Sequence, residues 1–343
     1  YLGGGALNDC AYSAHWTMEP IMFQPKGKDF ADMSFGPLQG YEGRNYVGSS
    51  EGALSGEGKA SVTQKTGSEK LKGKAYSYRM EAQVTDSGNN AISTVSSAIV
   101  HPASFYIGLS NIKNVKGFSK KGDTLKFDYV CVTPEGTAPS SSFLPQGDER
   151  KLSIELLRED WKEVQQVAWN GRLTTRYERV MVSEEVKSVP LSGSLSKTEI
   201  SVTPPKGGAY VLRLSGEDAE GRDVITETRF YVTSSDWYLW SRDFAEEITL
   251  TTDKESYEVG ETAQILMRSP LPKGRYLISI EREGILSQEV KVIEEPTSVL
   301  SFTIKENYVP VMYVALSSYS LRTDSPAKNY EDKLVSSLYI VEN

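Results

Sequence analysis

The sequence predicts an all-β chain of three sandwiches in tandem, each of the immunoglobulin or fibronectin type III kind. The first observation is that short segments with alternating apolar and polar residues recur along the chain, as half-buried strands require. The second is that turn residues separate these segments at intervals of about eight to twelve positions, which is typical of sandwiches. The third is a hairpin spacing that occurs twice, as expected of a repeated module.

The composition agrees with a globular protein that has several cores. A chain of 343 residues accommodates two or three domains. Its net charge of −8 gives no electrostatic support to nucleic-acid binding. Because no run of about 18 apolar residues occurs, we expect no membrane contact by these residues. The chain opens on Tyr-Leu-Gly-Gly-Gly, and such a start suggests an excerpt from a longer sequence.

The first predicted module covers residues 1–103. A glycine-rich region at 35–58 is expected to be a long irregular surface loop rather than a binding site. His101 and Pro102 end the module and lead at once to Phe105, which predicts a short, stiff joint that packs between modules. Strands are expected at 10–18, 60–65, 76–85 and 92–100.

The second predicted module covers residues 104–235. Residues 134–147 form a loop by composition. Charged residues alternate with valines between 178 and 187, which indicates an edge strand protected against stray pairing. Strands are expected at 105–109, 125–132, 152–157, 163–168, 175–182, 198–202, 210–217 and 224–232.

The third predicted module covers residues 236–343 and opens with Trp237 and Trp240. We expect these two rings to pack neighbouring modules together; stacking on a ligand is the alternative. Between 253 and 284 the chain predicts a tight turn at Gly260 and then two half-buried strands. The seven strands of the module are expected at 248–252, 262–268, 275–281, 287–293, 298–304, 311–317 and 336–341.

The repeated hairpin starts with a tyrosine and turns at an aspartate eight residues later. Tyr78 precedes Asp86 in the first copy, and Tyr210 precedes Asp218 in the second. An Asp–Gly turn between two strands explains both copies better than a coincidence of spacing. The two turns resemble fragments of calcium loops, but they lack the required spacing of acidic ligands, so we interpret them as turns only.

One connection is about twice as long as a hairpin of this pattern needs. Residues 317–337 are polar and carry Arg322, Lys328 and Lys333, which makes the segment a candidate protease-accessible loop. An ordinary solvated loop is the alternative.

Nothing in the sequence predicts catalysis, a metal or a cofactor. His15 and His101 are the two histidines, and neither stands near a nucleophile and an acid in the sequence. Cys10 and Cys131 add too few ligands for a zinc site of the usual kind, and we expect two free thiols rather than a disulfide. We therefore expect a protein that is not an enzyme.

Several motifs resemble the bacterial alpha-2-macroglobulin family. The most specific is YEVGETAQILMRSP at 257–270, followed at short distance by an alternating strand and EREG at 281–284. The stretch VHPASFYIGL at 100–109 is similar to a junction between two domains of that family. The opening at 1–18 also resembles the family, although its Asn-Asp-Cys at 8–10 departs from the usual small and proline-rich residues.

The resemblance implies an internal piece of a larger bacterial protease inhibitor, close to its bait region. In that family a protease cleaves the bait and the inhibitor rearranges to trap it, so these three modules would be scaffold. Neither cysteine lies in the family's thioester motif, so no covalent role is carried over. The implied partners are proteases and the neighbouring macroglobulin, bait and thioester-type domains. The implied location is periplasmic or extracellular, with the parent a membrane-anchored lipoprotein.

Two other classes of protein stay open on the sequence alone. Tandem sandwiches also build adhesion or binding proteins of the cell surface. The 19 tyrosines leave room for a carbohydrate-active accessory domain, which would need exposed coplanar rings. Large apolar contacts between modules would favour the inhibitor scaffold, whereas an open groove or barely touching domains would favour adhesion.

Overall fold

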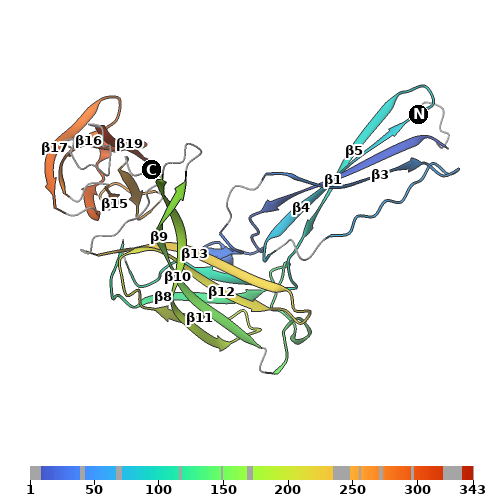
Figure 1. Ribbon diagram of the computed structural model, residues 1–343, viewed down its shortest axis with the longest axis horizontal. Helices are drawn as coiled ribbons and strands as arrows, with labels where there is room; N and C mark the ends of the chain where they lie inside the picture. Colours follow the sequence, from blue (N-terminus) through green and yellow to red (C-terminus); the bar gives the residue numbers. More distant parts are fainter. Residues whose placement is uncertain are drawn as a thin grey trace.

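A computed structural model describes residues 9–38, 43–66, 72–115, 118–147, 150–167, 173–234, 248–254, 256–269, 273–294, 297–319 and 334–342. These residues form almost only β-strands, which confirms the predicted all-β class. Figure 1 shows an N-terminal sheet, a middle sandwich and a C-terminal sandwich in the order of the chain. The exact module boundaries at 103 and 235 stay predictions. Across the described part of the chain, no helix is long and apolar enough to cross a membrane.

The N-terminal sheet has four antiparallel strands in the order β3-β1-β4-β5. One face carries a small apolar cluster centred on two buried tyrosines of β4, Tyr76 and Tyr78. The described residues of this segment form this one sheet, whereas the short strand β2 (Met33–Phe35) joins the middle sandwich by pairing with β6. The strands of the sheet are β1 (Ala11–Ile21), β3 (Asn45–Ala53), β4 (Ala75–Thr85) and β5 (Ala91–Val100).

Two expectations for this segment are wrong. The region 35–58 is not one long loop, because it contains β3. The two glycines of β3 lie close to other side chains: a Cβ at Gly48 would lie 2.7 Å from Gln64 Oε1, and one at Gly52 would lie 2.9 Å from the Tyr12 ring. The stretch 60–65 is not a strand; Val62 is its one β-branched aliphatic residue, and none of its side chains is fully buried.

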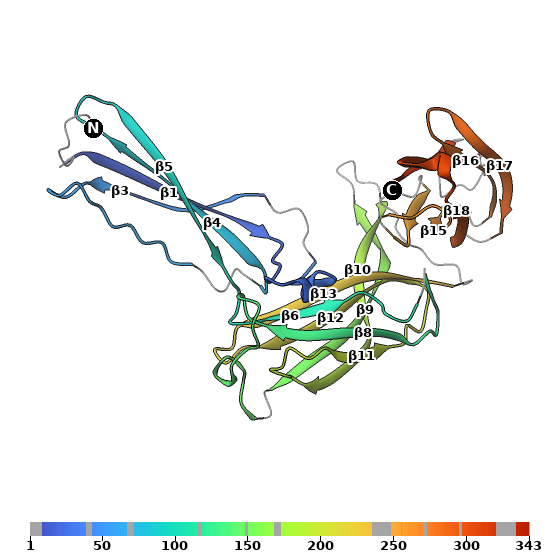
Figure 2. The ribbon, with the colours of Figure 1, turned by 180° about the vertical axis from the view of Figure 1, so that it is seen from behind.

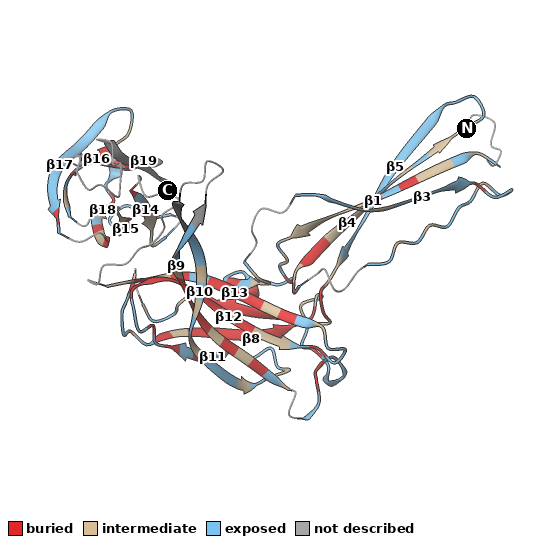
Figure 3. Ribbon diagram, in the orientation of Figure 1, coloured by how far each residue is buried: buried red, intermediate tan, exposed pale blue. Residues whose placement is uncertain are grey.

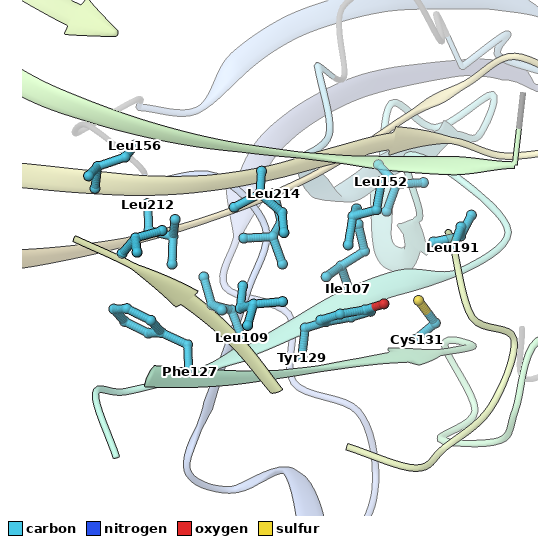
Figure 4. Packing of buried hydrophobic residues seen from close by; sticks show 14 of the residues in the cluster. Ile107, Leu109, Phe127, Tyr129, Cys131, Leu152, Leu156, Leu191, Leu212 and Leu214 are labelled. Atoms are coloured by element: carbon cyan, nitrogen blue, oxygen red, sulfur yellow. The ribbon is translucent and has the colours of Figure 1, made fainter. Parts of the chain in front are cut away.

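The middle sandwich packs two sheets around the largest core of the described residues. One sheet has the order β10-β9-β12-β13-β7 and the other β11-β8-β6-β2. Figure 4 shows Leu152 and Leu214 from the first sheet above Ile107, Phe127 and Cys131 from the second. The strands are β6 (Tyr106–Ser110), β7 (Ser119–Lys120), β8 (Leu125–Val132), β9 (Lys151–Val167), β10 (Leu173–Pro190), β11 (Thr198–Val202), β12 (Gly208–Glu217) and β13 (Asp223–Thr233).

The hairpin of β9 and β10 is longer than the sequence pattern indicates. The two strands expected at 152–157 and 163–168 are one continuous strand, which pairs with β10 along its whole length. β12 follows β9 only as far as Arg158, so the rest of the hairpin is a two-stranded ribbon that rises from the sandwich in Figure 2. β10 lies at the edge of its sheet, which confirms the edge strand predicted within 178–187.

The C-terminal sandwich packs a sheet of order β14-β15-β18 against one of order β17-β16-β19-β20. Its core contains the inward residues of the strand–turn–strand predicted at 253–284, among them Ile265 and Ile278. Figure 3 shows the buried residues inside this sandwich and the exposed strand β17 at its rim. The strands are β14 (Thr249–Thr252), β15 (Thr262–Arg268), β16 (Gly274–Glu281), β17 (Ile285–Ile293), β18 (Thr297–Thr303), β19 (Val311–Tyr319) and β20 (Leu334–Glu342).

Both predicted hairpins are present, since β4 pairs with β5 and β12 pairs with β13. Their turns share one hydrogen-bond pattern, in which the aspartate N–H donates to the carbonyl four residues later and its Oδ1 accepts that residue's N–H. The residue with positive φ is Asn89 in the first turn and Gly221 in the second. Gly88, two residues after Asp86, is therefore not the residue that supplies the positive φ of the first turn.

Candidate functional site

The joint after the N-terminal sheet is a small aromatic cluster. Nδ1 of His101 lies 2.7 Å from the Tyr106 hydroxyl, and the ring of Phe23 stacks on Tyr106 with 4.1 Å between centroids. Burial lowers the pKa of His101 below its usual 6.5, and the nearby Glu135 carboxylate acts in the opposite direction. Pro102 is buried at the joint, and the side chain of Phe105 lies wholly within the core of the middle sandwich.

A buried carboxylate anchors this joint to the hairpin of β12 and β13. Oδ2 of Asp218 accepts hydrogen bonds from the N–H (3.0 Å) and the hydroxyl (2.8 Å) of Ser104, and from Nε of Arg222 (2.8 Å). Oδ1 accepts two backbone N–H groups of the turn. Burial by itself would raise the pKa of Asp218, but the hydrogen bonds from Arg222 and Ser104 outweigh it and lower the pKa to about 2. The group therefore stays charged inside the protein.

A second tie joins the segment after β2 to the middle sandwich. The fully buried hydroxyl of Thr226 donates to the Ile107 carbonyl and accepts the N–H of Gly36 at 3.1 Å. Glu227 donates its N–H to the Gly36 carbonyl and accepts the N–H of Leu38 with its side chain. β13 is thus held to both β6 and the segment that follows β2, which closes one side of the sandwich.

The middle and C-terminal sandwiches meet at an arginine. The guanidinium of Arg268, at the end of β15, lies over the ring of Tyr231 in β13, with 4.9 Å to the centroid. Burial lowers the pKa of Arg268, and Tyr231 acts in the opposite direction. A cleft of about 1180 Å³ lies beside this contact, with β13 on one wall and the Thr251–Lys254 region on the other.

The conspicuous motif at 257–270 is structural. The hydroxyl of Tyr257 donates to Asp253 Oδ1 at 2.6 Å, and the same oxygen accepts the N–H of Gln264 at 2.9 Å. Gly260 adopts φ of 92° in the turn and donates its N–H to the Ile304 carbonyl. These bonds fix the entry into β15, so the motif shapes the C-terminal sandwich and presents no reactive group.

The candidate protease-accessible loop connects two neighbouring strands. β19 and β20 are antiparallel, and their pairing ends with Tyr319 opposite Leu334. Arg322, Lys328 and Lys333 lie between these two ends and outside the described residues. Trp237 and Trp240 also lie outside the described residues, so their expected packing stays a prediction.

The remaining titratable candidates show no catalytic arrangement in the described residues. His15 is exposed on β1, opposite Ser49 in β3 and Glu81 in β4, yet no hydrogen bond joins the three side chains that a relay would need. Cys10 and Cys131 are both free, and burial raises the pKa of the Cys131 thiol to about 12. The described part of the chain contains no group of three or more acidic, histidine or cysteine side chains placed to hold a metal.

Sequence reasoning missed the residues that make the structural ties. Asp218 was interpreted as a turn residue only, although it also binds Ser104 far away in the chain. The partners of Thr226, Tyr231 and Arg268 have no local signal in the sequence. A buried position for Thr226 follows from the alternation of β13, but its partners depend on how the strands assemble.

The fold and these ties define a chain of tandem β-modules with polar and aromatic contacts at their joints. Comparison with known proteins shows what the chain resembles. Residues 248–337 match the model of the alpha-2-macroglobulin bait region domain. An alpha-2-macroglobulin homolog of Nostoc sp. is 21% identical over 254 residues, and the alpha-2-macroglobulin of Pasteurella multocida is 24% identical over 229 residues. The chain is thus similar to alpha-2-macroglobulins over much of its length, and the match to their bait region domain covers residues 248–337.

The matched regions are small parts of longer relatives. The alignments cover 74% and 67% of this chain, but only 12% of the Nostoc protein and 11% of the Pasteurella protein. Among solved structures, native Escherichia coli alpha-2-macroglobulin aligns with 100% of this chain and 21% of its own, at 17% identity and a TM-score of 0.46.

Proposed function

We propose that this chain is part of the scaffold of a protease-trapping inhibitor, and that the segment between β19 and β20 is where an attacking protease cuts. The observation that carries this proposal is the length of that connection within the matched bait region domain. Tyr319 and Leu334 lie opposite each other, and about two to five residues would join such ends. The chain inserts residues 320–333 instead, with three basic side chains.

The two strands that flank the segment suit such a site. β19 pairs along its length with β16 on one side and β20 on the other, so it is held within the sheet. A cut between β19 and β20 would leave both strands in place but remove the covalent link between them. After the cut, β20 would be held to β19 by strand pairing alone, and the core would stay folded.

Limited digestion with trypsin tests the site of cutting. We expect the first cut after Arg322, Lys328 or Lys333, identified from the masses of the fragments. A variant with all three residues changed to glutamine should lose this first cut at least about tenfold in rate. Lys59→Gln is the matched control, because Lys59 is an exposed lysine of a described loop, and this change should leave the rate unaltered. A first cut elsewhere would contradict the proposal.

The trapping step concerns the longer protein of which we propose this chain to be a part. Its support is the set of polar ties that fix one module against the next, because a rearrangement after cutting needs rigid bodies and defined joints. Small-angle scattering of the longer polypeptide before and after cleavage should show a change in shape. An unchanged scattering curve would count against trapping.

The partners and the location follow from the same proposal. The partners would be proteases and the neighbouring macroglobulin, bait and thioester-type domains of the longer chain. The location would be the periplasm or the cell exterior, with the parent anchored to a membrane as a lipoprotein. Cell fractionation that recovers the parent in the cytoplasm would contradict this part.

A further inference from the structure

Within the part of the chain that the structure describes, the outermost strand of the C-terminal sandwich has an unpaired edge. β17 pairs with β16 on one side and is the last strand of its sheet. Every residue of β17 except Ile293 is exposed, including Val290 (67%) and Val292 (54%). A row of unpaired backbone N–H and C=O groups beside exposed valines is a surface that another strand can extend.

The charges on β17 favour one register for an antiparallel pair formed by the β17 strands of two copies. In an antiparallel pair formed by two identical strands, residues that face the same side of the sheet stand opposite each other. A pair centred on Glu289 would put two glutamates opposite each other, and one centred on Lys291 would put two lysines opposite each other. Centring on Val290 places each Glu289 opposite the Lys291 of the second copy, so both pairs of charges attract.

The apolar side chains agree with the same register. Val290 stands opposite Leu277 of β16, which is 42% exposed on the outer face of the sheet. With Val290 at the two-fold axis, exposed apolar side chains form one row across the two sheets. The row runs from Leu277 to Val290 and on to Val290 and Leu277 of the second copy. The two four-stranded sheets would thereby become one continuous sheet with a joined apolar stripe.

We propose that two copies of this chain associate through β17, antiparallel and centred on Val290. The interface is isologous, since the same residues face each other from both copies. β5, the free edge of the N-terminal sheet, is a weaker candidate because its ten residues carry no charge that would select a register. The proposal is independent of the protease-cutting segment, because it uses only β16 and β17.

Sedimentation velocity of the whole chain at about 1 to 100 µM tests this proposal. We expect the wild type to show a concentration-dependent dimer. Glu289→Lys puts lysines opposite Lys291 and should raise the dissociation constant by about tenfold or more. The double variant E289K/K291E exchanges the two charges and should restore the wild-type value.

A mixture of two single variants adds a readout that does not require the double variant to fold. E289K alone and K291E alone should both be impaired, whereas their equimolar mixture should form a heterodimer, because the two lysines of one copy then face the two glutamates of the other. Glu51→Lys, on the edge strand β3 of another sheet, is the matched control and should dimerise like the wild type. A monomeric wild type, an E289K variant that dimerises normally, or a mixture that stays monomeric would overturn the proposal.

Discussion

The carboxylate of Asp218 accepts two hydrogen bonds from Ser104, which lies 114 residues earlier in the chain. Ser104 belongs to the joint that follows the N-terminal sheet, and Asp218 belongs to the turn between β12 and β13. One buried charge therefore organises its own hairpin turn and holds the joint against it. The equivalent turn aspartate of the first hairpin, Asp86, bonds within its own turn to Asn90. The two copies of the hairpin thus use the same turn for different purposes.

Replacing Asp218 should be much more costly than replacing its counterpart. Asp218→Ala leaves the Ser104 N–H and the Arg222 guanidinium without their carboxylate, and we expect a loss of about 2–4 kcal/mol in the free energy of unfolding. Asp86→Ala removes an exposed turn contact and should cost about 0.5–1 kcal/mol. Urea denaturation of both variants gives the comparison. Equal losses would contradict the anchoring role of Asp218.

The stability of the middle sandwich should fall in acid through the same carboxylate. The folded-state pKa of Asp218 is about 2, below the ordinary 3.8, so the charged form stabilises the fold. This contribution, about 2 kcal/mol, is complete above pH 4 and is lost as the pH falls from about 4 to about 2. Thermal unfolding of the wild type and Asp218→Asn against pH should show a shallower acid slope in the variant. Parallel slopes would contradict the lowered pKa.

His101 should titrate below the ordinary histidine range. Burial disfavours its charged form, so the neutral ring contributes stability above pH 6.5 that is lost as the pH falls below that value. The chain has two histidines, which makes assignment by nuclear magnetic resonance direct with His15→Gln. Because Glu135 raises the pKa of His101, Glu135→Gln should lower it further. A pKa at or above 6.5 for His101 would contradict the buried joint.

The contact of Arg268 with Tyr231 should couple the two sandwiches energetically. A double-mutant cycle with Arg268→Gln and Tyr231→Leu isolates their interaction, for which we expect about 0.5–2 kcal/mol. Lys305 and Tyr308 form a more distant pair, at 5.9 Å, within the C-terminal sandwich and provide the control. Its coupling should be smaller. A coupling of zero between Arg268 and Tyr231 would show that the modules meet without this contact.

The alternation of side chains predicted much of this fold. Ala263, Ile265 and Met267 face one way in the sequence pattern, and all three are fully buried. In a half-buried strand every second residue is apolar and faces the core. The position of the strand and the orientation of its side chains therefore both follow from the local sequence. The pattern fails where other forces shape a strand. β3 is rich in glycine because neighbouring side chains lie close to its backbone, and this requirement resembles the composition of a loop.

The ties between modules could not be predicted in the same way. Asp218 has the sequence signal of a turn, and its bond to Ser104 depends on two segments brought together by the whole sandwich. Arg268 alternates with the inward residues Ile265 and Met267 of β15, and its side of the strand faces Tyr231 of the middle sandwich. Local sequence tells which side of a strand a residue occupies, and only the assembled fold tells what lies on that side.

The central claim is that the chain is scaffold of an inhibitor that traps the protease that cuts it. The most direct measurement adds trypsin to the longer polypeptide of which we propose this chain to be a part, and follows two activities of the protease. A trapped protease should lose most of its activity on a large protein substrate and keep its activity on a small peptide substrate, because only the small one reaches it. Equal activity on both substrates after the cut between β19 and β20 would contradict the account.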